Sequence, residues 1–191
     1  MRVFSLFLFI LSSACLALAD GVDDRTTPSH YLMGFLGQGQ LIFGSQDPRY
    51  GGGILFGYGR PEPRFQLGQI PAQLVYEGYA DETRSPGAGG ESPNETFAVG
   101  VLGLSRWRWP LDKNGNGVYV DLGWGLQFAN QATIDLDSEL NSTPVLGFGG
   151  TFKSGTQEYM IGLRYLHISN AGFKKPNDGQ NELLLTFGVR Y

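Results

Sequence analysis

"GVYVDLGWGLQF", residues 117–128, alternates between two kinds of side chain. The even positions from Val118 to Phe128 are all apolar, whereas the odd positions are tyrosine, glycine or polar residues and include Asp121 and Gln127. Successive side chains of a β-strand point to opposite faces of its sheet, so a period of two predicts a strand with one apolar face. Residues 182–191 repeat the alternation with the other parity, and the printed chain stops on the aromatic Tyr191.

Similar segments recur along the whole chain. About eight of them, the usual number for a small barrel, can be recognised, near residues 31–45, 52–59, 64–81, 95–109, 117–131, 143–153, 157–170 and 182–191. Turn-rich sequences separate them, namely RPEP (60–63), RSPGAGGESPN (84–94), DKNGNG (112–117) and KSGTQ (153–157). No amphipathic helical pattern appears after the first residues. The sequence therefore predicts an all-β protein.

Two architectures can bury such strands. A soluble sandwich or lipocalin-like barrel points the apolar face inward, whereas an outer-membrane barrel points it at lipid and keeps a polar lumen. The polar face here is rich in glycine, which suits a crowded eight-stranded lumen, and Trp107, Trp109 and Tyr191 lie near expected strand ends. These features favour an eight-stranded antiparallel transmembrane β-barrel of the bacterial outer membrane. The aromatic end resembles the C-terminal signal of such barrels, which implies the barrel assembly machinery as a partner during insertion.

The first 19 residues have the pattern of a secretory signal peptide. Arg2 supplies the positive charge, Val3 to Leu11 form the apolar run, and Ala17-Leu18-Ala19 is a small-residue cleavage site. A membrane-anchor helix and a lipoprotein signal at Cys15 are the alternatives. Cleavage after Ala19 leaves residues 20–191 to form a single barrel domain and removes the only cysteine, so we expect no disulfide.

Charge and composition exclude some functions. The chain has 14 Lys and Arg against 18 Asp and Glu, without a block of like charges, so a nucleic-acid partner is not expected. The segment 112–117 resembles the start of a calcium loop, but its twelfth position is Gly123 rather than glutamate. We therefore interpret this segment as a hairpin turn and predict no metal site.

A second stretch, "HISNAGFKKPNDGQNE" (167–182), concentrates polar side chains near the last strand. By alternation, His167 and Ser169 share the outward face of their strand with Ile161 and Leu163. A polar pair on a lipid-facing surface is costly without a use, so it suggests a functional site. The other interpretation is that this end of the strand already lies in the headgroup zone, where both residues are harmless.

The motif His-x-Ser-Asn-Ala-Gly, followed by Lys-x-Pro-Asn-x-Gly, resembles the signature of the outer-membrane lipid A 3-O-deacylases, the PagL-type family. The resemblance implies an eight-stranded barrel with a Ser-His-acid site on its outer wall. Ser169 is then the nucleophile and His167 the base, acting on the ester of a 3-hydroxyacyl chain of lipid A without metal or organic cofactor. With both termini periplasmic, the loop 171–181 lies at the cell surface, beside lipopolysaccharide.

The resemblance also suggests groups that bind the oxyanion and the substrate. The candidates are Asn170, Asn177 and backbone N-H groups around Ala171 and Gly172. Lys174 and Lys175 either contact lipid A phosphates or form a solvated pair in the loop, and the sequence leaves both interpretations open.

The third member of the site departs from the family pattern. The family's acid falls two residues after the Gly of Pro-Asn-x-Gly, a position that is Asn181 here, with Glu182 as the alternative. In a regular last strand Asn181 shares the outward face with Leu183, whereas Glu182 points into the lumen, and a bulge would reverse this. We expect Asn181 to orient the imidazole, and a carboxylate at position 181 to raise the rate.

Two other functions remain open at this point, a non-catalytic structural or adhesive outer-membrane barrel and a soluble secreted lipid-binding barrel. The sequence does not determine the acyl position or chain length cleaved. It also does not determine whether the barrel forms a homodimer among the outer-membrane lipids.

Overall fold

The computed structural model describes residues 28–87, 89–90 and 92–191. The predicted signal peptide, Cys15 and the cleavage site before Asp20 lie outside the described residues. These residues form nine strands: β1 (Ser29–Gly39), β2 (Tyr50–Leu67), β3 (Ile70–Ser85), β4 (Asn94–Pro110), β5 (Gly117–Ala129), β6 (Leu140–Ser142), β7 (Val145–Ser154), β8 (Gln157–Ile168) and β9 (Gln180–Arg190). No helix long and apolar enough to cross a membrane occurs among the residues that the structure describes.

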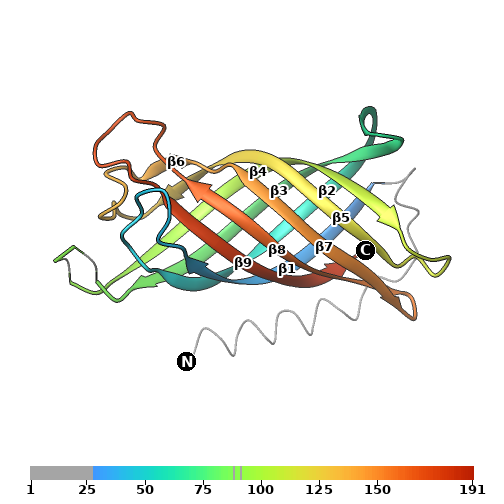
Figure 1. The fold of residues 1–191 in the computed structure, drawn as a ribbon. Coiled ribbons are helices and arrows are strands. Elements are labelled where there is room, and N and C mark those ends of the chain that lie inside the picture. Colours follow the sequence, from blue (N-terminus) through green and yellow to red (C-terminus); the bar gives the residue numbers. More distant parts are fainter. Residues whose placement is uncertain (1–27, 88, 91) are drawn as a thin grey trace.

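Eight long antiparallel strands close into a barrel (Figure 1). Each of them pairs with its neighbours in chain order, and β1 pairs with β9 to complete the ring. The short β6 adds to one end of β5, beyond the point where β7 leaves it. The prediction of an eight-stranded antiparallel barrel is confirmed.

The apolar face of each strand points away from the barrel. Val118, Leu122 and Trp124 are 41%, 56% and 54% exposed, whereas Tyr119 and Asp121 on the other face are 2% and 0% exposed. This polarity is the reverse of a soluble barrel and matches a protein surrounded by lipid.

The lumen is filled by paired charges and aromatic rings. An Arg106 nitrogen lies 2.7 Å from Asp121, and Arg164 bridges Glu77 at 2.6 Å and Asp121 at 3.0 Å. Buried charges are tolerated only when they are paired in this way. Glycine makes room for the rings, because a Cβ on Gly57 would lie only 2.1 Å from the ring of Tyr31.

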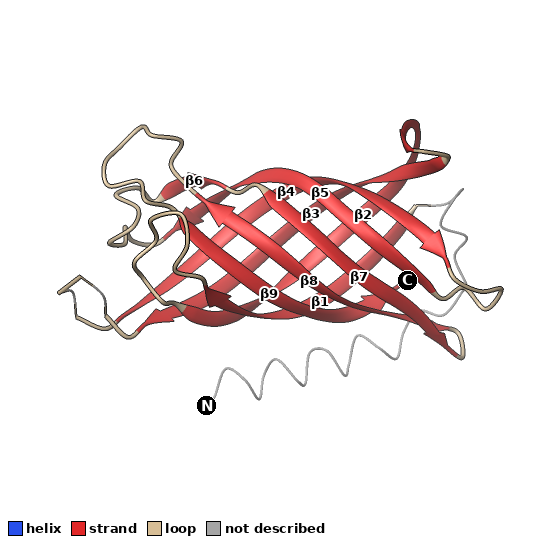
Figure 2. Ribbon diagram, in the orientation of Figure 1, coloured by secondary structure: helices blue, strands red, loops and turns tan. Residues whose placement is uncertain are grey.

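The two ends of the barrel differ (Figure 2). Short turns join β2 to β3, β4 to β5 and β7 to β8, and β1 begins and β9 ends at this same end, whereas longer loops join the strands at the other end. Outer-membrane barrels have short periplasmic turns and longer outer loops, so the loop after β8 faces outward. At the short-turn end the ring of His30 stacks on that of Tyr191 at 6.0 Å and lies tilted against that of Tyr58 at 5.1 Å, which fits an interfacial aromatic girdle.

One predicted turn was wrong. Residues 60–63, RPEP, belong to β2, and the actual turn is Gly68-Gln69. Because β1 pairs with β2 only as far as Gly59, the rest of β2 has a neighbour on one side and accommodates Pro61 without losing a ladder hydrogen bond there. A register shift between Glu62 and Gln66 marks the bulge that follows.

The segment predicted at 64–81 was wrong at its start, because its first residues belong to β2 and the turn Gly68-Gln69 falls inside it. The other boundaries hold with two exceptions. The first strand ends at Gly39 rather than near residue 45, and the separate β6 precedes the segment predicted at 143–153. The turns predicted after β3, β4 and β7 are confirmed.

Candidate functional site

The predicted catalytic residues lie on β9 and at the end of β8, beside β6, at the long-loop end of the barrel. His167 on β8 is paired with Asn181 on β9, and Ser169 forms a bridge with Ser142 of β6 on the other side. Residues paired across antiparallel strands point to the same face, so these four side chains share the outer wall. The alternation had predicted this face for His167, Ser169 and Asn181.

His167 and Asn181 are in direct contact. The Nδ1 atom of His167 lies 2.8 Å from Oδ1 of Asn181, and the Tyr165 hydroxyl donates to the same oxygen over 2.5 Å. The Nδ2 group of Asn181 donates to the carbonyl of Ile42 over 2.9 Å. Asn181 is fully buried, although its face is outward, because Tyr165 and the loop between β1 and β2 cover it.

Glu182 lies on the opposite side of the same strand. The pairing of β8 with β9 runs without a register shift through this point, so Glu182 faces the lumen. A Cβ on the inward-facing Gly37 would lie 3.9 Å from Oε2 of Glu182. The strand therefore brings Asn181, and not Glu182, to the imidazole.

Ser169 is half-buried and is held by Ser142. The backbone N-H of Ser142 donates to the Ser169 carbonyl over 2.7 Å, and the Ser169 N-H donates back over 3.0 Å. The two hydroxyl oxygens are 3.3 Å apart. Among the described residues, the Ser169 hydroxyl bonds to Ser142 and not to His167. The imidazole is nevertheless its neighbour two positions back on the same face, where a side-chain rotation can bring the two together.

The loop after β8 organises the other candidates. Asn170 is buried and tied into the loop, because its Nδ2 donates to the Lys174 carbonyl and its Oδ1 accepts from Gly172 N-H. Oδ1 of Asn177 accepts from Asn170 N-H at 2.9 Å. No hydrogen bond of the Asn177 Nδ2 is found within the described part of the chain. Asn177 is therefore better placed than Asn170 to donate to a ligand.

Lys174 and Lys175 lie on the exposed part of this loop. Their side chains show no ion pair with another described residue. The geometry therefore leaves both interpretations of this pair open.

Sequence reasoning gave no role to Gly179, which lies against the imidazole. Its φ is +76°, and a Cβ on it would lie 2.7 Å from Cε1 of His167. Only glycine fits both the backbone conformation and the space. The available signal was the final Gly of Pro-Asn-x-Gly.

Asp135 holds the loops above the site together. Its carboxylate accepts hydrogen bonds from the Ser45 hydroxyl at 2.8 Å and from the N-H groups of Gln46 and Asp47 at 2.9 and 3.1 Å. Its backbone carbonyl accepts from Asp178 N-H at 3.0 Å. The β1–β2 loop is thus fixed against the β8–β9 loop.

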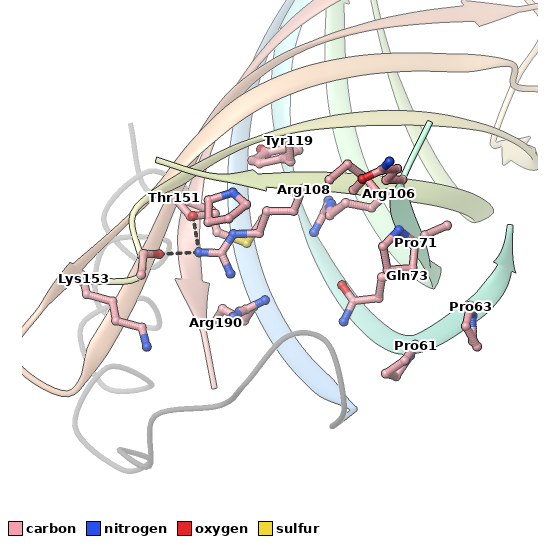
Figure 3. Close-up of a pocket in the computed structure, with 16 residues that line it drawn as sticks. Pro61, Pro63, Pro71, Gln73, Arg106, Arg108, Tyr119, Thr151, Lys153 and Arg190 are labelled. Atoms are coloured by element: carbon pink, nitrogen blue, oxygen red, sulfur yellow. Dashed lines mark hydrogen bonds between the residues drawn. The ribbon is translucent and has the colours of Figure 1, made fainter. Parts of the chain in front are cut away.

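A cavity lies elsewhere in the barrel. It has a volume of about 680 Å³ and lies inside the barrel at the short-turn end, where Arg106, Arg108, Lys153 and Arg190 line it (Figure 3). None of the predicted site residues lines this cavity. The candidate site is instead an open one on the outer wall. Within the described residues, no group of three or more His, Cys, Asp or Glu side chains could hold a metal ion.

Comparison with known proteins identifies the family. The model of the lipid A 3-O-deacylase family (PagL) matches residues 56–190. The chain belongs to this family. The lipid A deacylase PagL of Bordetella bronchiseptica is 30% identical over 106 residues, which are 54% of this chain and 55% of that protein. The chain thus matches about half the length of this curated relative.

The fold of the family is also shared. A crystal structure of the outer membrane enzyme PagL superposes with a TM-score of 0.56 and 18% identity, covering 83% of this chain and 98% of that one. This likeness supports the barrel architecture. Membership of the family and the lipid-facing apolar wall make the protein an integral outer-membrane barrel.

Proposed function

We propose that this protein is a lipid A 3-O-deacylase that uses Ser169 and His167, with Asn181 as the third member. The observation that carries the proposal is the arrangement of these residues on one face of the outer wall, with His167 bonded to Asn181. Membership of the PagL family gives the substrate class. The reaction is hydrolysis of the ester that holds a 3-hydroxyacyl chain on lipid A.

The hydrogen bonds support different roles for the two nitrogens of the His167 imidazole. Because Oδ1 of Asn181 accepts a hydrogen bond, Nδ1 of His167 carries the proton and Nε2 is free. Nε2 takes the proton of the Ser169 hydroxyl as its oxygen attacks the ester carbonyl, and returns it to the departing sugar oxygen. Water then attacks the acyl-serine and loses its proton to Nε2, which passes it to the departing Ser169 oxygen as the bond from that oxygen to the acyl carbon breaks, and the fatty acid leaves. This sequence uses no metal or cofactor.

The developing oxyanion needs donors near Ser169. Asn177 is the favoured side chain, because its Oδ1 already accepts a hydrogen bond and its Nδ2 has no hydrogen bond to another described residue. Asn170 and Gly172 then act by shaping the loop that carries Asn177.

The position of the site supports a lipid substrate in the outer leaflet. It lies at the long-loop end and beside exposed apolar residues of the same wall, such as Leu146, Leu183 and Leu185. Lys174 and Lys175 on the adjoining loop can meet the phosphates of lipid A. A homodimer and recognition by the barrel assembly machinery stay predictions.

Mass spectrometry of lipid A from cells with and without the protein tests the proposal. We expect loss of one 3-hydroxyacyl chain with the wild type, and a rate lower by on the order of 10³-fold or more in Ser169→Ala and His167→Ala. Ser154→Ala, at the short-turn end, is the matched control and should cleave normally. Unchanged lipid A in cells rich in folded wild-type barrel would contradict the assignment.

A further inference from the structure

The amide of Asn181 has three hydrogen-bond partners that differ in what they can do. The Tyr165 hydroxyl and the His167 imidazole can each donate or accept a hydrogen bond. The Ile42 carbonyl, 2.9 Å from Nδ2, can only accept. Of the three partners, it is therefore the carbonyl that dictates which end of the amide faces it.

A tight turn presents this carbonyl to the site. Ser45 N-H donates to the Ile42 carbonyl over 3.2 Å, and the two residues between them, Phe43 and Gly44, have φ values of +55° and +102°. A residue with a Cβ rarely adopts a positive φ, so Phe43 is under backbone strain. Such strain persists where the surroundings fix the backbone, and here Asp135 holds Ser45, the last residue of the turn, and Gln46, which follows it.

We infer that the turn formed by residues 42–45 is a positioning element of the site. Its Ile42 carbonyl holds the Asn181 amide with Oδ1 toward His167 and so keeps the imidazole proton on Nδ1. The inference rests on the proposed function, which requires a free Nε2 to accept the proton of Ser169. With the amide reversed, Nδ2 would donate to Nδ1, the proton would sit on Nε2, and the imidazole could not act as a base.

The same contact changes the expectation for a carboxylate at position 181. Aspartate has acceptors at both edges, so Asn181→Asp sets a carboxylate oxygen against the Ile42 carbonyl. The position is fully buried, and two acceptors without a donor between them repel each other. Asn181 is therefore matched to this loop, and aspartate should make the enzyme slower rather than faster.

The tautomer of His167 tests the inference without reference to activity. The chain has two histidines, so the His30→Gln protein, labelled with nitrogen-15 histidine and folded in detergent micelles, reports on His167 alone. We expect the Nδ1-H tautomer in long-range proton–nitrogen spectra. Gly44→Val, which puts a branched residue at positive φ, should populate Nε2-H. Phe43→Gly relieves the strain and should keep Nδ1-H.

An Nε2-H tautomer in the parent, or an unchanged tautomer in Gly44→Val, overturns the inference. Heat-dependent gel mobility establishes that each variant is a folded barrel.

Deacylation rates provide a second test of the inference. With the turn intact, Asn181→Asp should be about tenfold slower than the parent, the scale of one buried hydrogen bond. In the Gly44→Val background the displaced carbonyl no longer opposes aspartate, so Asn181→Asp should equal or exceed asparagine. A faster Asn181→Asp protein with the turn intact overturns the inference. If the parent cleaves no lipid A, the proposed function fails, while the tautomer still decides the positioning role.

Discussion

At the scale of single residues, the parity of the last strand decides which side chain completes the site. The alternation of β9 could be recognised in the sequence, and it predicted that Asn181 faces outward and Glu182 inward. The register of β9 against β8 confirms both orientations. The contact of Asn181 with Ile42 could not be predicted from the sequence, because Ile42 is 139 positions away and accepts the hydrogen bond through its backbone carbonyl. A backbone carbonyl leaves no trace in residue type.

A substitution at Glu182 tests this assignment. Glu182→Gln removes a carboxylate that lies in the lumen, so deacylation should stay within about threefold of wild type, the size of effects transmitted through packing alone. Asn181→Leu removes the partner of the imidazole and should lower the rate at least about tenfold. Both rates are measured on purified lipid A in detergent. A large loss in Glu182→Gln with a folded barrel would point to Glu182 as the third member.

At the scale of elements, the strands follow from alternation, but two features required knowledge of neighbours. RPEP has the composition of a turn, yet it continues β2 because one side of that strand is unpaired. The three residues of β6 are too few to show a pattern, and Pro144 separates them from β7. Even so, β6 and β7 keep one register against both β5 and β8, so they act as one interrupted strand.

The backbone of β6 should matter to catalysis because it anchors the end of β8. Ser142→Pro removes the N-H that donates to the Ser169 carbonyl over 2.7 Å, and we expect deacylation to fall by about tenfold or more. Ser142→Ala keeps this backbone bond and loses only the hydroxyl contacts, so its rate should change by less than about fivefold. Equal rates in the two variants would show that β6 does not position the nucleophile.

At the scale of the whole molecule, the barrel reverses the usual arrangement of polar and apolar residues. Glycine, tyrosine and charged residues on the inward positions were visible in the sequence, and they predicted a crowded polar lumen. Which charges meet was not predictable, because the pairs join strands far apart in the chain. Arg164 on β8 meets Glu77 on β3 and Asp121 on β5, and Tyr31 on β1 donates to Glu77.

This network should account for a large part of the stability of the barrel. Arg164→Met keeps the length of the side chain but leaves Glu77 and Asp121 short of a partner in a fully buried place. Loss of one member of a buried ion pair costs about 3–5 kcal/mol, so the urea midpoint of the barrel refolded in lipid vesicles should fall sharply. Arg84→Met breaks ion pairs of a half-exposed arginine, and screening by water should leave its midpoint almost unchanged.

Restoring neutrality with Glu77→Gln in the Arg164→Met protein should recover part of the loss, because the unpaired carboxylate is then gone. Similar midpoints for Arg164→Met and Arg84→Met would show that packing of the rings, rather than pairing of charges, holds the lumen together.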